Sequence, residues 1–366
     1  MPAQALPVPS PETMLAVYRP DIAQELAVMD APSYRLRQVY EHLLRRHLEP
    51  FSLATTLPIQ TRQALDALGA STLEEAGLQT AGDGTVKLLL AAQDGLCIET
   101  VLMTYRDRVT VCLSSQVGCP VKCTFCATGA MGFERNLTTA EIVDQARAAS
   151  SRAAMDGRKV SNIVYMGMGE PLLNTHAVLD SIRILTDPNG FGLGHRSLSV
   201  STVGIPAGIL KLARAEPQVN LALSLHAADD RTRALLVPKT YRRPLSEILV
   251  AAWEHFAITH RKLLVEYVLL RGINDSPEDA RRLAALLRGH AVTVNLLTWN
   301  PPHGPRAGVA ASDPALRLIF VAAPQKTVIG FRDALLAAGV EAVIRRSKGS
   351  GIQAACGQLA GRRRSF

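Results

Sequence analysis

Three cysteines lie close together in the segment Cys119-Pro-Val-Lys-Cys123-Thr-Phe-Cys126. One short loop can wrap three thiolates around a single centre, so this spacing indicates a metal site. A structural zinc ion needs four ligands, and the closest histidines, His176 and His195, belong to later parts of the chain. Three cysteines on one loop suit a [4Fe–4S] cluster with one iron left open. We therefore expect these cysteines to hold such a cluster, with a zinc site or free thiols as the alternatives.

A glycine-rich segment, Gly167-Met-Gly169-Glu170-Pro171, follows a predicted buried strand at residues 162–166. Taken alone, such a segment can be a tight turn between a strand and a helix. At this distance after the three cysteines, a ligand-binding turn is the better interpretation. Gly169 and Glu170 are therefore candidate binding residues.

Further polar groups follow three other predicted strands. Ser201 ends the strand at 198–202, Ser224-Leu225-His226 ends the next strand, and Asn300 follows the strand at 292–297. Each of these residues taken singly is more often a turn or cap residue. Together they occupy the positions from which hydroxyl, imidazole and amide groups can hold a ligand at the end of a sheet.

The elements that must position these residues alternate between strands and helices after Cys126. Predicted strands at 162–166, 198–202, 221–225, 263–269, 292–297 and 340–345 are separated by helical segments. About six such units predict an α/β fold with a parallel sheet curled into a full or partial barrel. The active site is then expected where the strands end. Residues 309–325 fit no regular pattern and are interpreted as an insertion.

The remaining segments suggest a domain plan. The Pro- and Ala-rich residues 1–32 are expected to be a mobile lead-in, and residues 33–100 a small accessory domain of helices with short strands. Residues 101–347 are expected to form the core. Residues 348–366 are expected to form a C-terminal segment that contains Cys356 and a basic tail.

Composition limits the class of protein. Its 366 residues contain no apolar run of 18, which excludes a predicted membrane span. The first residues lack a secretory signal, and six cysteines are too few for a disulfide scaffold, so a cytoplasmic location is expected. Lys and Arg number 40 against 32 Asp and Glu, a net charge of +8 that hints at a polyanionic partner.

The motifs together resemble the radical S-adenosylmethionine (SAM) enzymes. The CxxxCxxC loop and the GxGEP turn resemble that superfamily's cluster-binding and SAM-binding motifs. The segments Cys112–Cys119, 165–174, 223–226 and 354–359 resemble one group within it, the bacterial RNA adenine C2 methyltransferases (RlmN), with the related C8 enzymes (Cfr) beside them. The resemblance implies a partial (β/α)6 barrel, one [4Fe–4S] cluster per chain, and SAM held by the residues Gly169, Glu170, Ser201, Ser224, Leu225, His226 and Asn300.

The same resemblance implies roles for three further residues. Cys356 would carry a methyl group as S-methylcysteine, two SAM molecules being consumed for each methyl transferred. Glu99 would accept the proton from the adenine ring. Cys112 would then attack Cys356 and release the product, which leaves a transient disulfide between the two.

The resemblance also implies RNA, ribosomal or transfer RNA or both, as the partner of a monomer reduced by a flavodoxin-type donor. Phosphate contacts could come from clustered basic residues, namely Arg35, Arg37, Arg45, Arg46, Arg242, Arg243, Arg345, Arg346, Lys348 and Arg362–Arg364. The chain departs from the family pattern at 295–298, at 301–325 and at Gly351-Ile352-Gln353. Methylation at C8, a radical SAM reaction on another substrate, and a non-enzymatic metal-binding module therefore stay open as alternatives.

Overall fold

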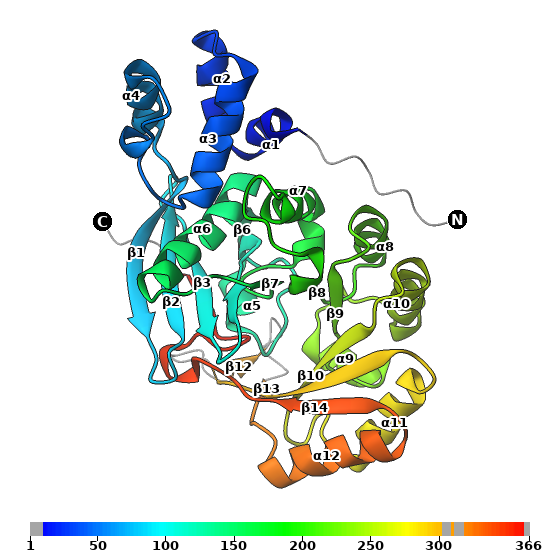
Figure 1. The fold of residues 1–366 in the computed structure, drawn as a ribbon. Coiled ribbons are helices and arrows are strands. Elements are labelled where there is room, and N and C mark those ends of the chain that lie inside the picture. Colours follow the sequence, from blue (N-terminus) through cyan, green and yellow to red (C-terminus); the bar gives the residue numbers. More distant parts are fainter. Residues whose placement is uncertain (1–9, 302–308, 311–317, 362–366) are drawn as a thin grey trace.

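Ten strands form one mixed sheet in the computed structural model, which describes residues 10–301, 309–310 and 318–361 (Figure 1). In sheet order they are β1 (Leu73–Thr80), β2 (Val86–Ala92), β3 (Cys97–Thr104), β4 (Val109–Cys112), β7 (Asn162–Tyr165), β8 (Leu198–Thr202), β9 (Asn220–Ser224), β10 (Leu263–Leu269), β11 (Val292–Thr298) and β14 (Glu341–Arg345). Two short antiparallel pairs lie outside it: β5 (Gln116–Gly118) with β6 (Phe133–Asn136), and β12 (Val309–Ala310) with β13 (Leu318–Ile319).

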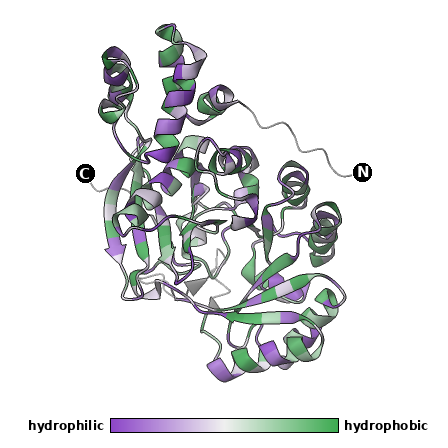
Figure 2. Cartoon of the chain, viewed as in Figure 1, coloured by the Kyte–Doolittle hydropathy of each residue, from purple (hydrophilic) through white to green (hydrophobic). Residues whose placement is uncertain are grey.

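Helices connect the strands and cover the outer side of the sheet. They are α1 (Pro11–Tyr18), α2 (Pro20–Val28), α3 (Ser33–Arg45), α4 (Ile59–Leu68), α5 (Ala127–Met131), α6 (Thr139–Met155), α7 (Thr175–Thr186), α8 (Pro206–Ala215), α9 (Asp230–Leu236), α10 (Leu245–Thr259), α11 (Pro277–Leu287) and α12 (Gln325–Ala337). Hydrophobic residues concentrate on the strands and on the helix faces that pack against them, and polar residues cover the outside (Figure 2). This pattern is expected when both faces of a sheet are buried.

The predicted α/β barrel is confirmed, and it is partial. From β4 through β7, β8, β9, β10 and β11 to β14, each strand pairs in parallel with the next. The order of the sheet begins at β1 and ends at β14, so these two strands are its edges. Because parallel strands all point the same way, their carboxyl ends meet at one rim, where loops can converge on a ligand.

The expected lead-in over residues 1–32 is wrong for residues 11–28, which form α1 and α2. Pro11 and Pro20 stand at the first helical positions, where a missing N–H costs nothing and the fixed φ suits a helix. Ser10 caps α1 by accepting the Thr13 N–H at 3.3 Å. Leu15 and Ile22 are fully buried, so both helices belong to the folded core.

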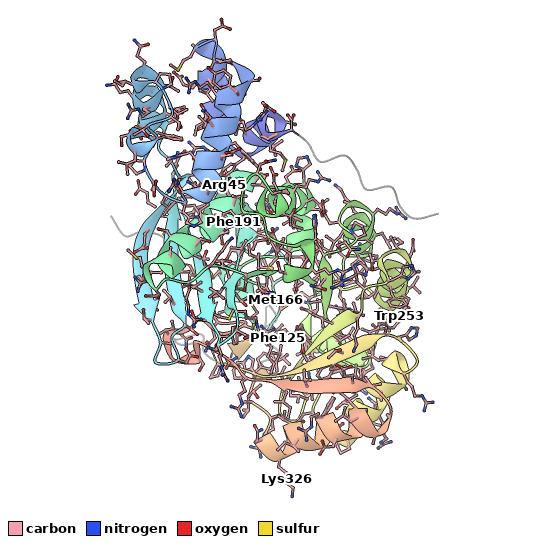
Figure 3. The ribbon with its side chains drawn as sticks, in the orientation of Figure 1. Arg45, Phe125, Met166, Phe191, Trp253 and Lys326 are labelled. Carbon is pink, nitrogen blue, oxygen red and sulfur yellow. The ribbon has the colours of Figure 1, made fainter. Side chains whose placement is uncertain are left out.

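The expected accessory domain at 33–100 is not a separate unit either. Its strands β1, β2 and β3 extend the sheet of the barrel, because β3 pairs antiparallel with β4. α1 to α4 gather at one end of the molecule, where α1 packs against α6 and α7 (Figure 1). Arg45 helps to attach them: it donates hydrogen bonds to the carbonyls of Pro188 and Asn189, close to Phe191 (Figure 3). It therefore serves as a structural contact here.

A buried ionic network also fastens the N-terminal helices to the barrel. Arg147 and Asp144 on α6 form an ion pair at 2.6 Å, and both side chains are fully buried. Tyr18 donates a hydrogen bond to Asp144 at 2.5 Å, and Arg147 donates to the carbonyls of Leu43 and Ala70. Every charge in this network has a partner, which is the condition under which buried charges are tolerated.

Candidate active site

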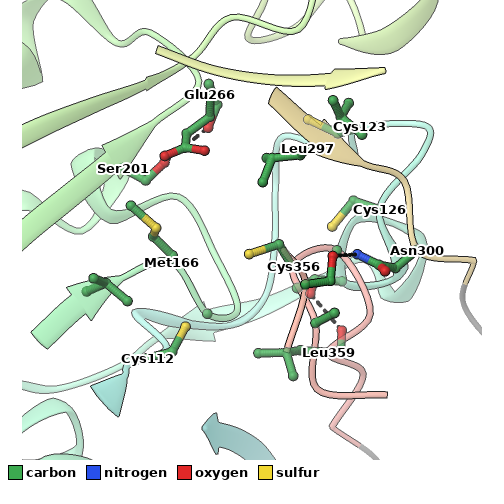
Figure 4. A pocket seen from close by; sticks show the side chains of 18 of the residues that line it. Cys112, Cys123, Cys126, Met166, Ser201, Glu266, Leu297, Asn300, Cys356 and Leu359 are labelled. Carbon is green, nitrogen blue, oxygen red and sulfur yellow. Dashed lines mark hydrogen bonds between the residues drawn. The ribbon is translucent and has the colours of Figure 1, made fainter. Parts of the chain in front are cut away.

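One cavity opens at the carboxyl ends of the parallel strands (Figure 4). Most of the residues expected at the site line it: Cys112, Cys119, Cys123, Cys126, Gly169, Glu170, Ser201, Ser224, His226, Asn300 and Cys356. Phe125 and Met166 mark its position in the middle of the molecule, far from Trp253 and Lys326 on the outer helices (Figure 3). Glu99 and Leu225 do not line it.

The loop with the three motif cysteines follows β5 and is braced on several sides. Cys119 N–H donates to Gly132 O at 2.7 Å, and Thr124 N–H donates to Leu236 O at 3.0 Å. Trp299 donates its indole N–H to Phe125 O at 3.0 Å. A Cβ on Gly129 would lie 2.8 Å from Cys123 O, so only glycine permits this close approach. The loop is therefore held in shape by the barrel.

The thiols of Cys119 and Cys123 lie in surroundings that disfavour the charged thiolate form. Burial, reinforced by the neighbouring Cys126, raises the pKa of Cys119 to about 12 and that of Cys123 well above its usual value. Arg233, buried next to Cys123, opposes this shift in Cys123. Thiols in such surroundings become thiolates when a metal centre supplies positive charge.

The donor set fits an iron–sulfur cluster. Three thiols line one cavity, and [4Fe–4S] clusters are bound by cysteine thiolates. The two histidines nearest in sequence are engaged elsewhere, since His176 lies 3.1 Å from Asp180 and His195 3.3 Å from Glu216. Among the described residues, no three Cys, His, Asp or Glu side chains form a ready single-ion site.

The glycine-rich turn after β7 is packed directly against the segment that leads to the cysteines. Gly169 has φ +101°, and a Cβ there would lie 2.6 Å from the side chain of Gln116. A Cβ on Gly167 would lie 2.7 Å from Leu113 O. Any larger residue than glycine would clash at both positions. The turn places Glu170 in the cavity wall near Cys119, and the negative charge of Glu170 contributes to the raised pKa of that thiol.

Glu170 is a buried carboxyl group. Burial raises its pKa to about 7, although the N–H groups of Val203 at 2.8 Å and Leu172 at 3.0 Å both favour the ionised form. A cationic ligand beside this carboxyl group would stabilise its ionised form, because the positive charge of the ligand offsets the cost of burying the negative charge. The amino group of SAM is a ligand of this kind.

The raised pKa of Glu170 predicts a pH-dependent stability. The folded protein holds this proton more tightly than the unfolded chain, so the stabilisation is complete below pH ~4.5 and is lost as pH rises through about 7. The loss is about 3 kcal/mol at about 1.4 kcal/mol per unit of pKa. Urea unfolding without SAM, at pH values on either side of this window, should show a smaller decline for Glu170→Gln than for wild type. Equal declines would contradict the prediction.

Ser201, Ser224 and His226 converge as the sequence predicted. The hydroxyls of Ser201 and Ser224 lie 3.0 Å apart at the ends of adjacent strands. His226 accepts the Val268 N–H on Nδ1 at 3.2 Å, which places its proton on Nε2. Burial, aided by Arg233, lowers the pKa of His226 to about 3. It is therefore a neutral donor at physiological pH.

Asn300 and Leu225 contribute differently. Asn300 lines the cavity and donates to Ser347 Oγ at 3.0 Å. The side chain of Leu225 is fully buried, and its N–H donates to Glu266 O at 3.1 Å. Leu225 thus supports the strand ends from behind the cavity wall.

Cys112 and Cys356 reach the same cavity from segments far apart in the sequence (Figure 4). Cys112 ends β4 and is 7% exposed; burial, with a contribution from Cys356, raises its pKa to about 12. Cys356 is solvent-exposed, yet the surrounding cavity wall still removes enough water to raise its pKa. Both are free thiols in this structure, and no disulfide joins them.

Glu99, on β3, lies behind the C-terminal segment rather than in the cavity. It is 6% exposed, and its Oε2 accepts the Ala360 N–H at 2.7 Å. Its Oε1 lies 3.0 Å from the ammonium group of Lys87. The sequence identified Glu99 only through the family resemblance, and it gave no sign that residues 353–361 cover it.

Two charged residues of the cavity escaped the sequence analysis of the site. Glu266, on β10, is 4% exposed, and its Oε2 has no partner within the described part of the chain. Arg345, expected only as a phosphate contact, lies 3.8 Å from Glu266 and lowers the pKa of Cys356 against the effect of burial. For Glu266 the available signal was a charged side chain inside an otherwise apolar strand; Arg345 ends β14, which also carries Glu341, and gave no such signal.

The cavity also fits a nucleoside sulfonium such as SAM. Glu266 and Ser201 lie together at one side of it, and the unpartnered carboxylate oxygen of Glu266 can accept from a ribose hydroxyl (Figure 4). Gly169 and Glu170 lie near the motif cysteines. The residues present therefore match both implied cofactors.

No helix within the described residues has the length and apolar character needed to cross a membrane.

Comparison with known proteins agrees with this geometry. The model of the radical SAM superfamily matches residues 113–284. The chain is 44% identical to a probable dual-specificity RNA methyltransferase RlmN of Thermus thermophilus, over 89% of both proteins. It is 45% identical to the protein of the same name from Moorella thermoacetica, over 93% of this chain and 95% of that one.

A solved structure gives the same result. The crystal structure of a radical SAM methyltransferase from Sphaerobacter thermophilus is 42% identical and superposes with a TM-score of 0.85, over 92% of this chain and 95% of that one. The two proteins are therefore similar in sequence and in fold over nearly their whole length. This chain belongs to the RlmN family of SAM-dependent radical methyltransferases.

Proposed function

We propose that this protein methylates C2 of an adenine in RNA through an S-methylcysteine formed at Cys356. The observation that carries the proposal is that Cys112 and Cys356 line the same cavity as the three motif cysteines and the Gly169–Glu170 turn. A radical SAM enzyme that acts directly on its substrate needs no such additional pair. The relatives named dual-specificity RNA methyltransferases support RNA as the substrate.

The need for a methyl-carrying cysteine follows from the substrate. Adenine C2 lies between two ring nitrogens and is electron-poor, so it cannot attack a methyl sulfonium as a nucleophile. When bound, the [4Fe–4S] cluster and two molecules of SAM supply a transferable methyl group and a 5′-deoxyadenosyl radical. Cys356 is exposed in the cavity and beside Arg345, which favours its thiolate, the form that accepts a methyl group.

The remaining steps use residues of this chain. The Cys356 methylene carbon bonds to C2 as a radical, which leaves one unpaired electron on the adduct. This electron would return to the bound cluster, and Glu99 accepts the ring proton. Cys112 then attacks Cys356 Sγ as a thiolate. The sulfur–methylene bond breaks, its electron pair and a proton complete the methyl group of the product, and the two cysteines are joined transiently. A flavodoxin-type donor would supply the electrons for the reaction, in a protein that we propose acts as a monomer, and the two cysteines must be reduced before the next turnover.

Access of RNA to this cavity requires an unstacked adenine. Arg346 and Lys348 line the cavity rim and offer positive charge to the phosphates beside the target. The basic tail at 362–364 and residues 302–308 and 311–317 lie outside the described residues. We propose ribosomal RNA, transfer RNA or both as substrates, in the cytoplasm.

The experiment compares three proteins under anaerobic, reducing conditions with SAM and RNA. Wild type should yield 2-methyladenosine, and peptide mass spectrometry should find one added methyl on Cys356. Cys119→Ala should lose both 5′-deoxyadenosine formation and RNA methylation, whereas Cys356→Ser should lose RNA methylation with its cluster intact. An 8-methyl product would favour the C8 reaction. Methylation by Cys356→Ser would refute the cysteine carrier.

A further inference from the structure

Lys87 is an unusual residue for a strand that is buried on both faces. It lies on β2 and is 9% exposed, although lysine is almost never buried without a partner. Its ammonium group lies 3.0 Å from Glu99 Oε1 and donates to Gln353 O at 3.3 Å. Lys87 therefore contacts both the expected proton acceptor and the segment that carries Cys356.

The strand register explains how Lys87 reaches Glu99. Leu89 of β2 stands opposite Glu99 of β3, so Lys87, two residues from Leu89, is a diagonal neighbour of Glu99 on the same face. The other oxygen of Glu99, Oε2, accepts the Ala360 N–H at 2.7 Å. The Lys87–Glu99 pair thus holds the C-terminal segment at both ends, at 353 and at 360.

Between these two points the segment is tied to the cysteine loop. Ala127 N–H donates to Gly357 O at 2.8 Å, and Thr128 donates its hydroxyl hydrogen to Leu359 O at 2.7 Å. Cys356 is therefore placed between the cluster-binding loop on one side and the Lys87–Glu99 pair on the other. The position of Glu99 relative to Cys356 depends on Lys87.

We propose that Lys87 is the positioning residue for the proton acceptor Glu99. Lys87 holds Oε1 and the carbonyl of Gln353 together. Because Oε2 is covered by the Ala360 N–H, this step requires Ala360 to move away before Oε2 takes the adenine proton. In this step the C2–H proton moves to Oε2, the electron pair of the C–H bond stays on the ring, and the one unpaired electron of the adduct would leave to the bound cluster. The inference rests on the proposed function, because it assumes that Glu99 accepts this proton.

The test measures coupling rather than activity alone. Wild type, Lys87→Met, Lys87→Arg and Glu99→Gln are loaded with the cluster and given SAM, reductant and RNA whose target adenine carries hydrogen or deuterium at C2. The readouts are the ratio of methylated adenine to 5′-deoxyadenosine and the isotope effect on that ratio. Lys262→Met is the matched control, since Lys262 pairs with Glu341 on the exposed surface.

We expect Lys87→Met to lower the ratio on the order of 10- to 100-fold, the effect of misplacing a reacting group by about 1 Å. The isotope effect should increase, because proton removal becomes slower than the competing steps. Lys87→Arg should restore part of the ratio, and Lys262→Met should match wild type. A general structural defect would instead lower both products together and leave their ratio unchanged.

Three results would overturn the inference, and they are distinguishable. If Glu99→Gln uncouples the reaction while Lys87→Met keeps the wild-type ratio and isotope effect, only the role of Lys87 fails. If Glu99→Gln itself couples like wild type, the proton-acceptor role in the proposed function fails and takes the inference with it. Equal losses of both products in Lys87→Met would assign Lys87 to stability alone.

Discussion

Cys112→Ala should convert the protein into one that stops as a covalent protein–RNA adduct. Cys356 can still take a methyl group and bond to the base, because it lies exposed in the cavity. The alanine offers no sulfur to attack Cys356, so the thioether bond persists. Denaturing electrophoresis of a reaction with SAM and reductant should show RNA that migrates with the protein, and released methyladenosine should fall to the level of a single turnover or less.

The burial of Cys112 sharpens this prediction. Its pKa of about 12 means that few molecules hold a thiolate there at neutral pH in the structure as it stands. Release in wild type should therefore be slow enough for a small amount of the adduct to be seen, and faster at higher pH. Cys97→Ala is the matched control, since Cys97 is buried and does not line the cavity. Normal turnover by Cys112→Ala would refute the two-cysteine mechanism.

Arg147→Met should produce the largest loss of stability among the substitutions considered. It removes the partner of Asp144 and leaves that carboxylate fully buried with its charge uncompensated. Burial alone would raise the pKa of Asp144, but Arg147 and the surrounding hydrogen bonds hold it below its usual value. Breaking such a pair costs about 3–5 kcal/mol. Urea unfolding should show this loss, and protease should cleave first near α1 to α4.

Two further variants separate the charge from the packing. Arg152→Met is the control, because it makes the same change on the same helix. Arg152 donates to Met155 Sδ and pairs with no carboxylate of the described chain, so its loss should change the free energy of unfolding little. The double variant Asp144→Leu/Arg147→Met removes both charges and should regain much of the lost stability. If the double variant is no more stable than Arg147→Met, the network acts through shape rather than charge.

Local patterns in the sequence were sufficient to find most of the cavity. The spacing of Cys119, Cys123 and Cys126 determines that one loop can gather them. The alternation of strands and helices predicts a parallel sheet, and a parallel sheet places the residues after each strand at one rim. Ser201, Ser224, His226 and Asn300 were found in this way, and the structure brings them to the same cavity.

Pairings between distant segments could not be predicted in the same way. β1 to β3 were expected in a separate domain. They join the barrel because β3 forms a hairpin with β4 and β4 pairs in parallel with the distant β7, a pairing that nothing local shows. The helices at 11–28 were missed because their prolines suggested irregular chain, whereas proline at a first helical position favours a helix.

By itself, the sequence determined the cysteine loop, the glycine-rich turn and the residues at the strand ends, because each depends on spacing within a few residues. Only the tertiary structure decided that Arg345 stands by Cys356, that Lys87 holds Glu99, and that residues 353–361 cover Glu99. Glu99 and Ala360 are more than 200 positions apart, Lys87 and Glu99 are neighbours across a sheet register, and Arg345 and Cys356 meet only because the C-terminal segment folds back over the cavity. Their formation depends on how the whole chain packs, which short-range spacing does not encode.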